Sequence, residues 1–86
     1  MKPSIGRIVI LKGRVENATD EHPAIITRVW SDECINVLGF FDATGVRSET
    51  SVYLFGDRAQ ATEFLRKHDE GSNPVVTVAA FWPERV

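Results

Sequence analysis

The feature that most constrains the fold is the order in which the hydrophobic patterns of the chain change. Four apolar runs rich in β-branched residues come first, a segment with helical period follows, and one more apolar run ends the series. Such runs, separated by turn residues, are typical of strands. The predicted strands cover residues 5–11, 24–30, 34–41, 46–55 and 75–82. Residues 17–23 are polar and predict a loop, and Gly39 predicts a bulge or a sharp bend inside its strand.

The segment after the fourth predicted strand indicates one short helix. Ala61, Phe64, Leu65 and His68 recur at i, i+3, i+4 and i+7, which places them on one helical face. Asp57 has the short acidic side chain that favours an N-cap position. We expect Phe64, in the middle of the apolar face, to be buried.

Four strands, a helix and a last strand fit a mainly β architecture. A five-stranded antiparallel SH3-like barrel carries its helical turn directly before the final strand, which matches this order. An OB-like barrel usually carries its helix between the third and fourth strands, so it and a general α+β fold remain the alternatives. With 86 residues, the chain is expected to form one small barrel domain over residues 1–86.

The charge balance argues against one class of function. Ten Lys and Arg against 12 Asp and Glu give a net charge of −2, whereas non-specific nucleic-acid binding needs a positive face that releases phosphate counterions. The charges are uneven, because Lys2, Arg7, Lys12 and Arg14 all precede the first acid, Glu16. A local anion-binding edge is therefore compatible with the sequence, and a wholly basic protein is not.

Signatures of catalysis and of metal binding are missing from the sequence. It contains no Gly-rich phosphate loop, no H-E-x-x-H and no G-x-S-x-G, so we expect a protein that is not an enzyme and uses no cofactor. His22, His68 and Cys34 lack the short spacing of metal ligands. A single cysteine, Cys34, excludes an internal disulfide and favours a small buried side chain in a reducing compartment. No apolar run is long enough for a membrane span, so we expect a cytoplasmic protein with no membrane partner.

The predicted strands are apolar on both faces. In the second strand Ile25 and Val29 point one way while Ile26 and Trp30 point the other. One helix covers only part of the second face of so small a domain. Exposed apolar patches of that size mark interfaces, so we expect a homo-oligomer, a dimer or larger.

Two pairs of aromatic and basic residues are the sharpest functional signal. Arg28 and Trp30 are two residues apart and share one strand face, and Trp82 and Arg85 flank Pro83. Tryptophan offers a stacking surface for a base, and arginine offers a forked donor for phosphate. The alternative is core packing for both tryptophans and solvation or ion pairing for the arginines. We expect further residues to line the same barrel mouth, which gives a predicted ligand site of Arg28, Trp30, Trp82, Arg85, Arg7, Arg47, Ser51 and Tyr53.

Several short words resemble a known group of proteins. They are Pro3-Ser4-Ile5-Gly6-Arg7, Pro23-Ala24-Ile25 with Arg28-Val29-Trp30, Cys34-Ile35-Asn36-Val37, and Phe81-Trp82-Pro83-Glu84-Arg85-Val86. Together they resemble a family of small proteins of tailed bacteriophages and prophages. The resemblance implies a phage protein acting in the host bacterial cytoplasm. It supplies no chemistry, and residues 56–73 carry no matching word.

These observations give three functional hypotheses. The first is a phage protein that sequesters a host nucleotide immune signal, of the cyclic nucleotide or cyclic ADP-ribose type, and so evades bacterial defence. Its partner is a small anionic nucleotide-like ligand. The second is a structural, assembly or protein-interaction module of the phage, and the third is a small nucleic-acid-binding barrel, which the acidic balance disfavours.

Overall fold

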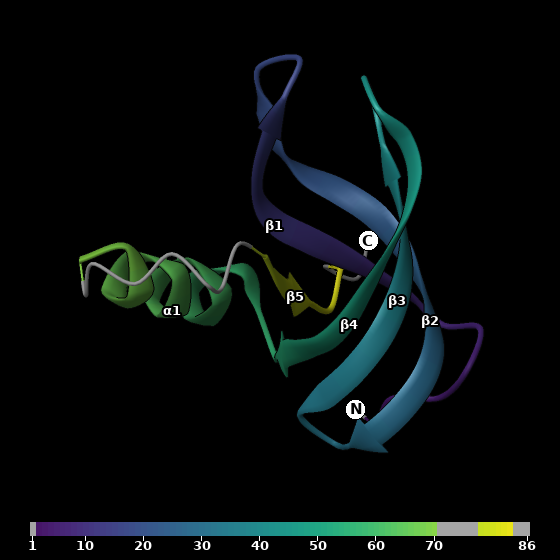
Figure 1. Ribbon diagram of the computed structural model, residues 1–86. Coiled ribbons are helices and arrows are strands. Elements are labelled where there is room, and N and C mark those ends of the chain that lie inside the picture. Colours follow the sequence, from purple (N-terminus) through teal and green to yellow (C-terminus); the bar gives the residue numbers. More distant parts are fainter. Residues whose placement is uncertain (1, 71–77, 84–86) are drawn as a thin grey trace.

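Five strands form a closed barrel, and one helix projects from its side (Figure 1). The computed structural model describes residues 2–70 and 78–83, with side chains for residues 2–67 and 78–83. The elements are β1 (Ile8–Glu16), β2 (Thr19–Ser31), β3 (Cys34–Phe41), β4 (Gly45–Phe55), α1 (Arg58–Glu70) and β5 (Ala79–Phe81). The predicted mainly β barrel with a short helix before the last strand is therefore confirmed, and it fits the SH3-like form. Of the last predicted strand, residues 75–77 lie outside the described residues.

The barrel is not antiparallel throughout. β1–β2, β2–β3, β3–β4 and β1–β5 pair antiparallel, but β4 and β5 pair parallel through Leu54 with Ala80 and Phe55 with Phe81. The prediction of a wholly antiparallel barrel was wrong at this pair. A closed ring with an odd number of strands cannot alternate in direction at every step, so one pair must be parallel. A parallel pair needs a crossover connection, and α1 lies in that connection.

The β1–β2 hairpin is longer than the sequence pattern indicates. The predicted loop over residues 17–23 was wrong, because β2 begins at Thr19 and the turn contains only Asn17 and Ala18. Both turn residues have positive φ, 50° and 66°, which is the backbone of the tight hairpin turn that matches strand twist. β1 in turn starts at Ile8 rather than at residue 5. This segment resembles a loop in the sequence because its residues are mostly polar. The polar residues nevertheless alternate with buried positions, among them His22, which is 2% exposed.

Gly39 does not form the predicted bulge. Its pairing with Ala24 on β2 and with Arg47 on β4 is regular, whereas the register of β2–β3 shifts after Ile26 and again after Val29. A Cβ on Gly39 would lie 2.8 Å from Leu11 Cδ1 and 2.9 Å from a ring carbon of Phe41. The glycine therefore serves a close approach of side chains inside the barrel, not a bend of the strand.

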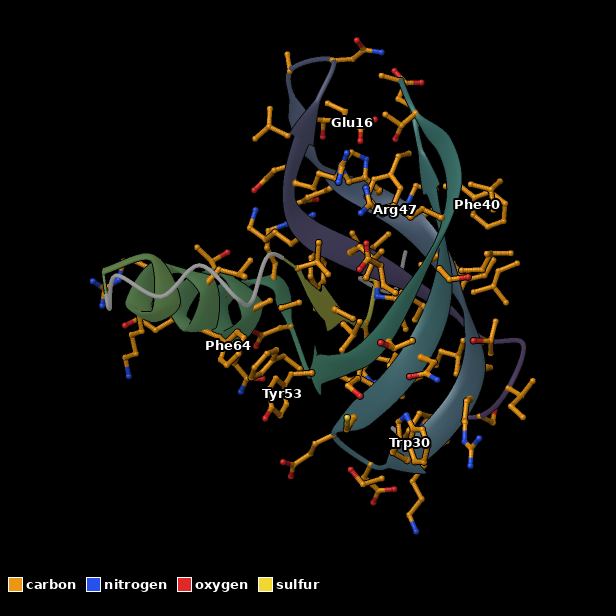
Figure 2. All side chains as sticks on the ribbon, viewed as in Figure 1. Glu16, Trp30, Phe40, Arg47, Tyr53 and Phe64 are labelled. Atoms are coloured by element: carbon orange, nitrogen blue, oxygen red, sulfur yellow. The ribbon has the colours of Figure 1, made fainter. Side chains whose placement is uncertain are left out.

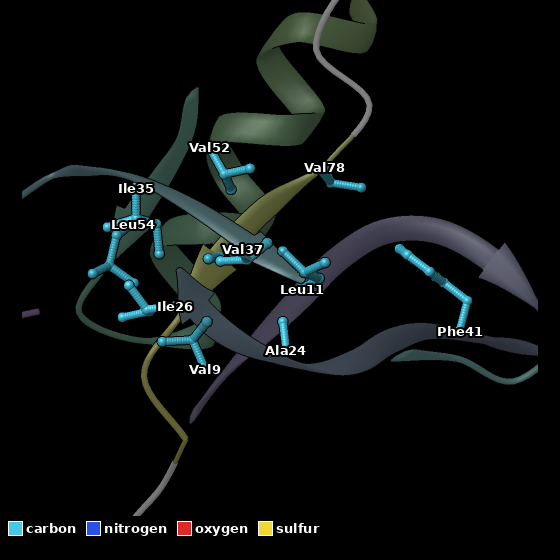
Figure 3. Close-up of a cluster of buried hydrophobic side chains, with 11 residues drawn as sticks. Val9, Leu11, Ala24, Ile26, Ile35, Val37, Phe41, Val52, Leu54 and Val78 are labelled. Carbon is cyan, nitrogen blue, oxygen red and sulfur yellow. The ribbon is translucent and has the colours of Figure 1, made fainter. Parts of the chain in front are cut away.

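The core fills the barrel interior with aliphatic side chains from all five strands and from Val78 (Figure 3). Val9, Leu11, Ile26 and Ile35 are fully buried in it. Burying a side chain of this size stabilises the fold by about 1.5–3 kcal/mol relative to leaving it in water. Buried positions alternate with more exposed ones along β3, whereas all three residues of β5 are buried between the barrel interior and α1.

A second cluster joins α1 to the barrel. Ala61 is buried against Ala79 and Phe81, while Phe64 packs beside Phe55 and Tyr53. Phe64 is half-buried, so the expectation of full burial was wrong; its ring covers the edge of the barrel and keeps one side in solvent. The predicted N-cap is confirmed, because the Gln60 N–H donates to Asp57 Oδ1 at 2.9 Å. The side chain of His68 lies outside the described residues.

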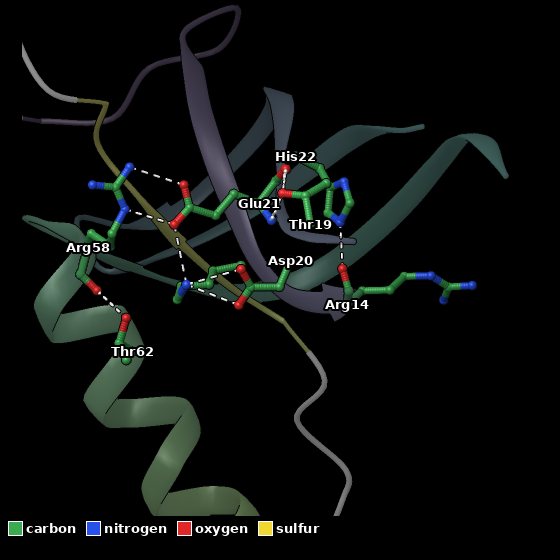
Figure 4. A network of polar contacts seen from close by, with 8 residues as sticks. Arg14, Thr19, Asp20, Glu21, His22, Arg58 and Thr62 are labelled. Atoms are coloured by element: carbon green, nitrogen blue, oxygen red, sulfur yellow. Dashed lines mark hydrogen bonds and ion pairs between the residues drawn. The ribbon is translucent and has the colours of Figure 1, made fainter. Parts of the chain in front are cut away.

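Charged side chains fasten the start of α1 to the β1–β2 hairpin (Figure 4). Arg58 Nε donates to Glu21 Oε2 at 2.8 Å, and Lys12 Nζ lies 3.3 Å from the same oxygen and 3.0 Å from Asp20 Oδ2. The hydrogen bond from Arg58 lowers the pKa of Glu21; burial opposes this, and the bond from Lys12 adds to it. The Arg58 guanidinium also lies 5.3 Å from the centre of the Phe81 ring, so one side chain connects helix, hairpin and last strand.

Neither described range contains a helix with the length and hydropathy needed to cross a bilayer.

Candidate functional site

The predicted Arg28–Trp30 pair exists as a stacked unit on the outer face of β2. The Arg28 guanidinium carbon lies 3.9 Å from the centre of the Trp30 ring, which is a close cation–π contact. The register of β2 with β3 shifts between Ile26 and Arg28 and again between Val29 and Ser31, and both Arg28 and Trp30 are exposed. Trp30 is 53% exposed, so core packing does not explain it.

Asn36 on β3 holds the indole in place. It is the cross-strand partner of Arg28, and its Oδ1 accepts a hydrogen bond from Trp30 Nε1 at 2.9 Å. The same oxygen accepts from the Ser51 backbone N–H on β4 at 2.8 Å. Arg28, Trp30, Asn36 and Ser51 thus form one continuous surface across three strands, which we call the Trp30 platform. Figure 2 places Trp30 at the end of the barrel opposite Glu16.

Ser51 has an unusual backbone. Its φ is +54°, a left-handed conformation that a residue other than Gly, Asn or Asp rarely adopts. The register of β3 with β4 shifts at the same level, between Ile35 and Val37. The bulge turns the Ser51 N–H toward Asn36 instead of into the regular ladder, which gives the conformation its hydrogen bond.

The platform presents positive charge and hydrogen-bond donors. Among residues 2–70 and 78–83, no carboxylate forms an ion pair with Arg28, and the acids of the nearby β2–β3 turn, Asp32 and Glu33, are exposed to solvent. Stacking on an indole leaves the N–H groups of a guanidinium free in its own plane. The platform can therefore donate hydrogen bonds to an anion while its flat surface contacts a planar ring.

The second predicted pair differs from expectation. Trp82 is half-buried and packs against the barrel core, so core packing accounts for much of its surface. Its basic neighbour among the described residues is Arg7, whose guanidinium carbon lies 5.4 Å from the ring centre. Arg85 lies outside the described residues. Arg7 and Trp82 form a pair of their own that sequence spacing does not reveal, because β1 pairs with β5 and so brings the residue before β1 close to the residue after β5.

The other two predicted residues do not join the platform. Arg47 lies opposite Gly39 on β4 and pairs with Glu49 at 3.5 Å, and Figure 2 shows it far from Trp30. Tyr53 packs against Phe64 of α1 with ring centres 5.3 Å apart. The expectation of one shared mouth was wrong, because the six steps along the strand from Arg47 to Tyr53 span about 20 Å of the barrel.

A groove lies between the end of β4 and α1. Its volume is about 770 Å³, and Tyr53, Phe55 and Phe64 contribute aromatic side chains to its wall. The lining residues are Glu33, Tyr53, Leu54, Phe55, Gly56, Ala59, Gln60, Glu63, Phe64 and Lys67. The sequence analysis missed this groove, although the helical face containing Phe64 and the outward position of Tyr53 were both visible in the pattern.

Side chains suited to metal binding are dispersed. Within the described ranges, no three His, Cys, Asp or Glu side chains gather in a way that would hold a metal ion. Cys34 is a free, half-buried thiol on β3. Neither feature adds chemistry to the platform or to the groove.

Comparison of the chain with protein-family models, with curated proteins and with solved structures found no match. The resemblance to phage proteins therefore stays a prediction.

Proposed function

We propose that the protein is a non-catalytic binding protein that holds an anionic nucleotide on the Trp30 platform. The observation that carries the proposal is the Arg28 guanidinium, which stacks 3.9 Å from the centre of an exposed indole and has no carboxylate partner in the described part of the chain. A surface arginine that serves stability alone is usually solvated or paired with an acid. Here its flat contact with Trp30 restrains it, so less side-chain freedom is lost when an anion binds.

The two parts of a nucleotide match the two parts of the platform. Phosphate oxygens accept hydrogen bonds from the N–H groups of Arg28, and charge-assisted bonds of this kind are among the stronger ones in proteins. Because the guanidinium already covers one face of the indole, the base stacks on the guanidinium–indole pair rather than on a bare tryptophan. Arginine planes and tryptophan rings both serve as stacking surfaces for bases.

The biological role within this proposal is sequestration of a host nucleotide immune signal in the bacterial cytoplasm. This part is based on the resemblance of the sequence words to small phage proteins. A protein without catalytic residues acts on a signal by lowering its free concentration, which requires tight binding and abundance but no reaction.

We further propose that the protein works as a homo-oligomer. Ile8, Phe40 and Val46 expose 56%, 38% and 59% of their surfaces on the outside of the barrel. Ile8 pairs with Ile25, and Ile25 with Leu38, so apolar side chains continue across three strands. A second copy covering this surface would bury it and enlarge the surface available to a ligand. Light scattering across a dilution series is expected to give a dimer or larger, and a mass of 9.6 kDa throughout would contradict it.

A protein-interaction module is the competing function, and the groove beside α1 favours it. An apolar groove between a strand and a helix suits a peptide or a partner surface better than a phosphate. This reading leaves the Trp30 platform unexplained. Substitutions in the groove and substitutions in the Trp30 platform therefore distinguish the two functions.

Isothermal titration of cyclic di-AMP, cyclic di-GMP and cyclic ADP-ribose tests the proposal. We expect the wild-type protein to bind at least one of them. Arg28→Ala should weaken that binding about ten- to a hundredfold, since a charge-assisted hydrogen bond contributes about 1.5–3 kcal/mol and 1.4 kcal/mol is a factor of ten. Arg66→Ala is the matched control, because it removes another exposed arginine, one that lies on α1. Absence of binding by the wild type to all three probes would overturn the proposal and favour the interaction module.

A further inference from the structure

Asn36 does more in the platform than support Trp30. An asparagine side chain has one acceptor oxygen and one NH₂ donor group. The oxygen is identified by its neighbours, because both groups that contact it, Trp30 Nε1 and the Ser51 N–H, can only donate. The amide orientation is thus fixed from two sides, and the NH₂ group of Asn36 points away from both donors.

That NH₂ group is available. In the described part of the chain, no hydrogen bond involves Asn36 Nδ2, while Oδ1 receives two. Asn36 is half-buried, so its position is held by the strands around it and its donor group reaches the surface. Because Arg28 is the cross-strand partner of Asn36, the NH₂ group and the guanidinium occupy one small region of the outer face.

The strained backbone of Ser51 indicates that this arrangement serves a function. A left-handed conformation at a serine is energetically unfavourable, and such residues gather at functional sites. A regular strand would leave Asn36 Oδ1 with Trp30 alone. The second bond from Ser51 fixes the amide more strongly than a support for one exposed indole requires.

We infer that Asn36 is a specificity-determining residue whose NH₂ group, together with Arg28, selects nucleoside phosphates over nucleosides and over free phosphate. The inference rests on the proposed function of the platform. Arg28 and Asn36 Nδ2 offer donors and no acceptor, so they recognise an oxygen that only accepts, as phosphate oxygens do. The stacked pair contributes only when a planar ring is joined to that phosphate. A ligand therefore needs both parts in one molecule to use the whole surface.

The first test compares Asn36→Asp with the wild type, using whichever of the three cyclic probes binds most tightly, and adenosine and inorganic phosphate as partial ligands. The substitution keeps an oxygen for Trp30 and Ser51 and replaces the NH₂ donor with an anionic acceptor. We expect the wild type to bind the probe at least tenfold more tightly than either partial ligand, and Asn36→Asp to lose at least tenfold in affinity for the probe. Equal probe affinity in the variant would overturn the inference.

A second measurement needs no variant and separates direct contact from an effect of the introduced charge on Arg28. In ¹H–¹⁵N spectra of the wild type, the Asn36 NH₂ signals should shift when the probe is added and should stay in place with adenosine. The Trp30 indole N–H signal in Asn36→Asp should match the wild type if the platform is intact. NH₂ signals that do not move with a bound probe would overturn the role of Asn36 and leave the proposed function standing. A wild type that binds no probe would overturn the proposed function itself.

Discussion

Glu16 and Thr44, 28 positions apart in the sequence, are joined by three hydrogen-bond contacts, one from the Thr44 backbone N–H and two from its hydroxyl. The Thr44 backbone N–H donates to Glu16 Oε1 at 3.0 Å, and the Thr44 hydroxyl donates to Oε2 at 2.9 Å. The Ala43 N–H and Arg14 Nε donate to the same carboxylate at 3.1 and 2.6 Å. One buried carboxylate therefore ties the β3–β4 turn to the end of β1.

This carboxylate makes the stability depend on acid pH. Burial by itself would raise the pKa of Glu16, but the hydrogen bonds from Arg14, Thr44 and Ala43 lower it from 4.5 to about 2. A group whose pKa is lower in the folded state stabilises the fold above its unfolded pKa and loses that contribution as the pH falls. We expect the free energy of unfolding to decrease between about pH 4.5 and pH 2. Urea titrations across this range measure it.

Replacing Glu16 should remove that dependence. Glu16→Gln keeps the size of the side chain but brings an NH₂ group toward donors, so the variant should be less stable at pH 7 and its stability should change less between pH 4.5 and pH 2. Asp32→Asn, in the exposed β2–β3 turn, is the control and should keep the wild-type slope. A wild-type slope in Glu16→Gln would show that another acid is responsible.

Gly39→Ala should destabilise the barrel. The added methyl group would meet Leu11 Cδ1 at 2.8 Å and the Phe41 ring at 2.9 Å, and overpacking of this kind destabilises by about 1–3 kcal/mol. For a domain of this size the melting temperature falls roughly 4–8 °C per kcal/mol. Gly56→Ala is the comparison, because its methyl group would approach only the flexible Gln60 side chain, at 3.2 Å. Equal melting temperatures for the two variants would contradict this account.

Phe64→Ala should destabilise less than a core substitution. A fully buried phenylalanine replaced by alanine loses about 3–5 kcal/mol, and Phe64 is half-buried between Tyr53 and Phe55. We expect a loss of about 1–3 kcal/mol in chemical unfolding. Phe64→Leu, which keeps most of the apolar surface, should recover part of it. No loss at all would mean that α1 contributes nothing to the stability of the barrel.

Replacing Arg58 should destabilise the protein more than replacing Arg66, although each arginine forms an ion pair with a glutamate. Arg66 and Glu63 form an exposed pair within the helix, and such pairs contribute little. Arg58 pairs with Glu21 on β2 and lies over Phe81 on β5, so Arg58→Ala should reduce stability by about 1–2 kcal/mol. Arg66→Ala should stay within about 0.5 kcal/mol of the wild type. Thermal unfolding of both variants side by side tests the ranking.

Local pattern predicted the order of the elements well. Residues 34–41 were predicted as a strand and are one, and Asp57 caps α1 as its side chain indicates. Alternation of apolar residues and the chemistry of short polar side chains are properties of neighbouring residues, so they are visible in the sequence. The length of the β1–β2 hairpin was not visible in the sequence, because its polar residues are held by Arg58 from a distant segment.

The candidate site, too, was predicted only in part. Arg28 and Trp30 are two residues apart on one strand, and their shared face followed from that spacing. Ser51 was among the predicted site residues, but Asn36 and its contact with the Ser51 backbone were missed, because that contact depends on the register shift between β3 and β4. The pairing of Arg7 with Trp82 depends in turn on the closure of the barrel.

That closure also constrains how the chain reaches its native state. Ile10 pairs with Phe81 and Lys12 with Ala79, so one of the two strands that neighbour β1 in the barrel is β5, the last strand of the chain. Contacts between segments so distant in sequence slow folding, because a long stretch of chain must be ordered before they form. During synthesis on the ribosome, β1 keeps an unpaired edge until β5 has emerged. The three-residue strand Ala79–Phe81 therefore decides when a growing chain stops presenting an edge to which another strand can add.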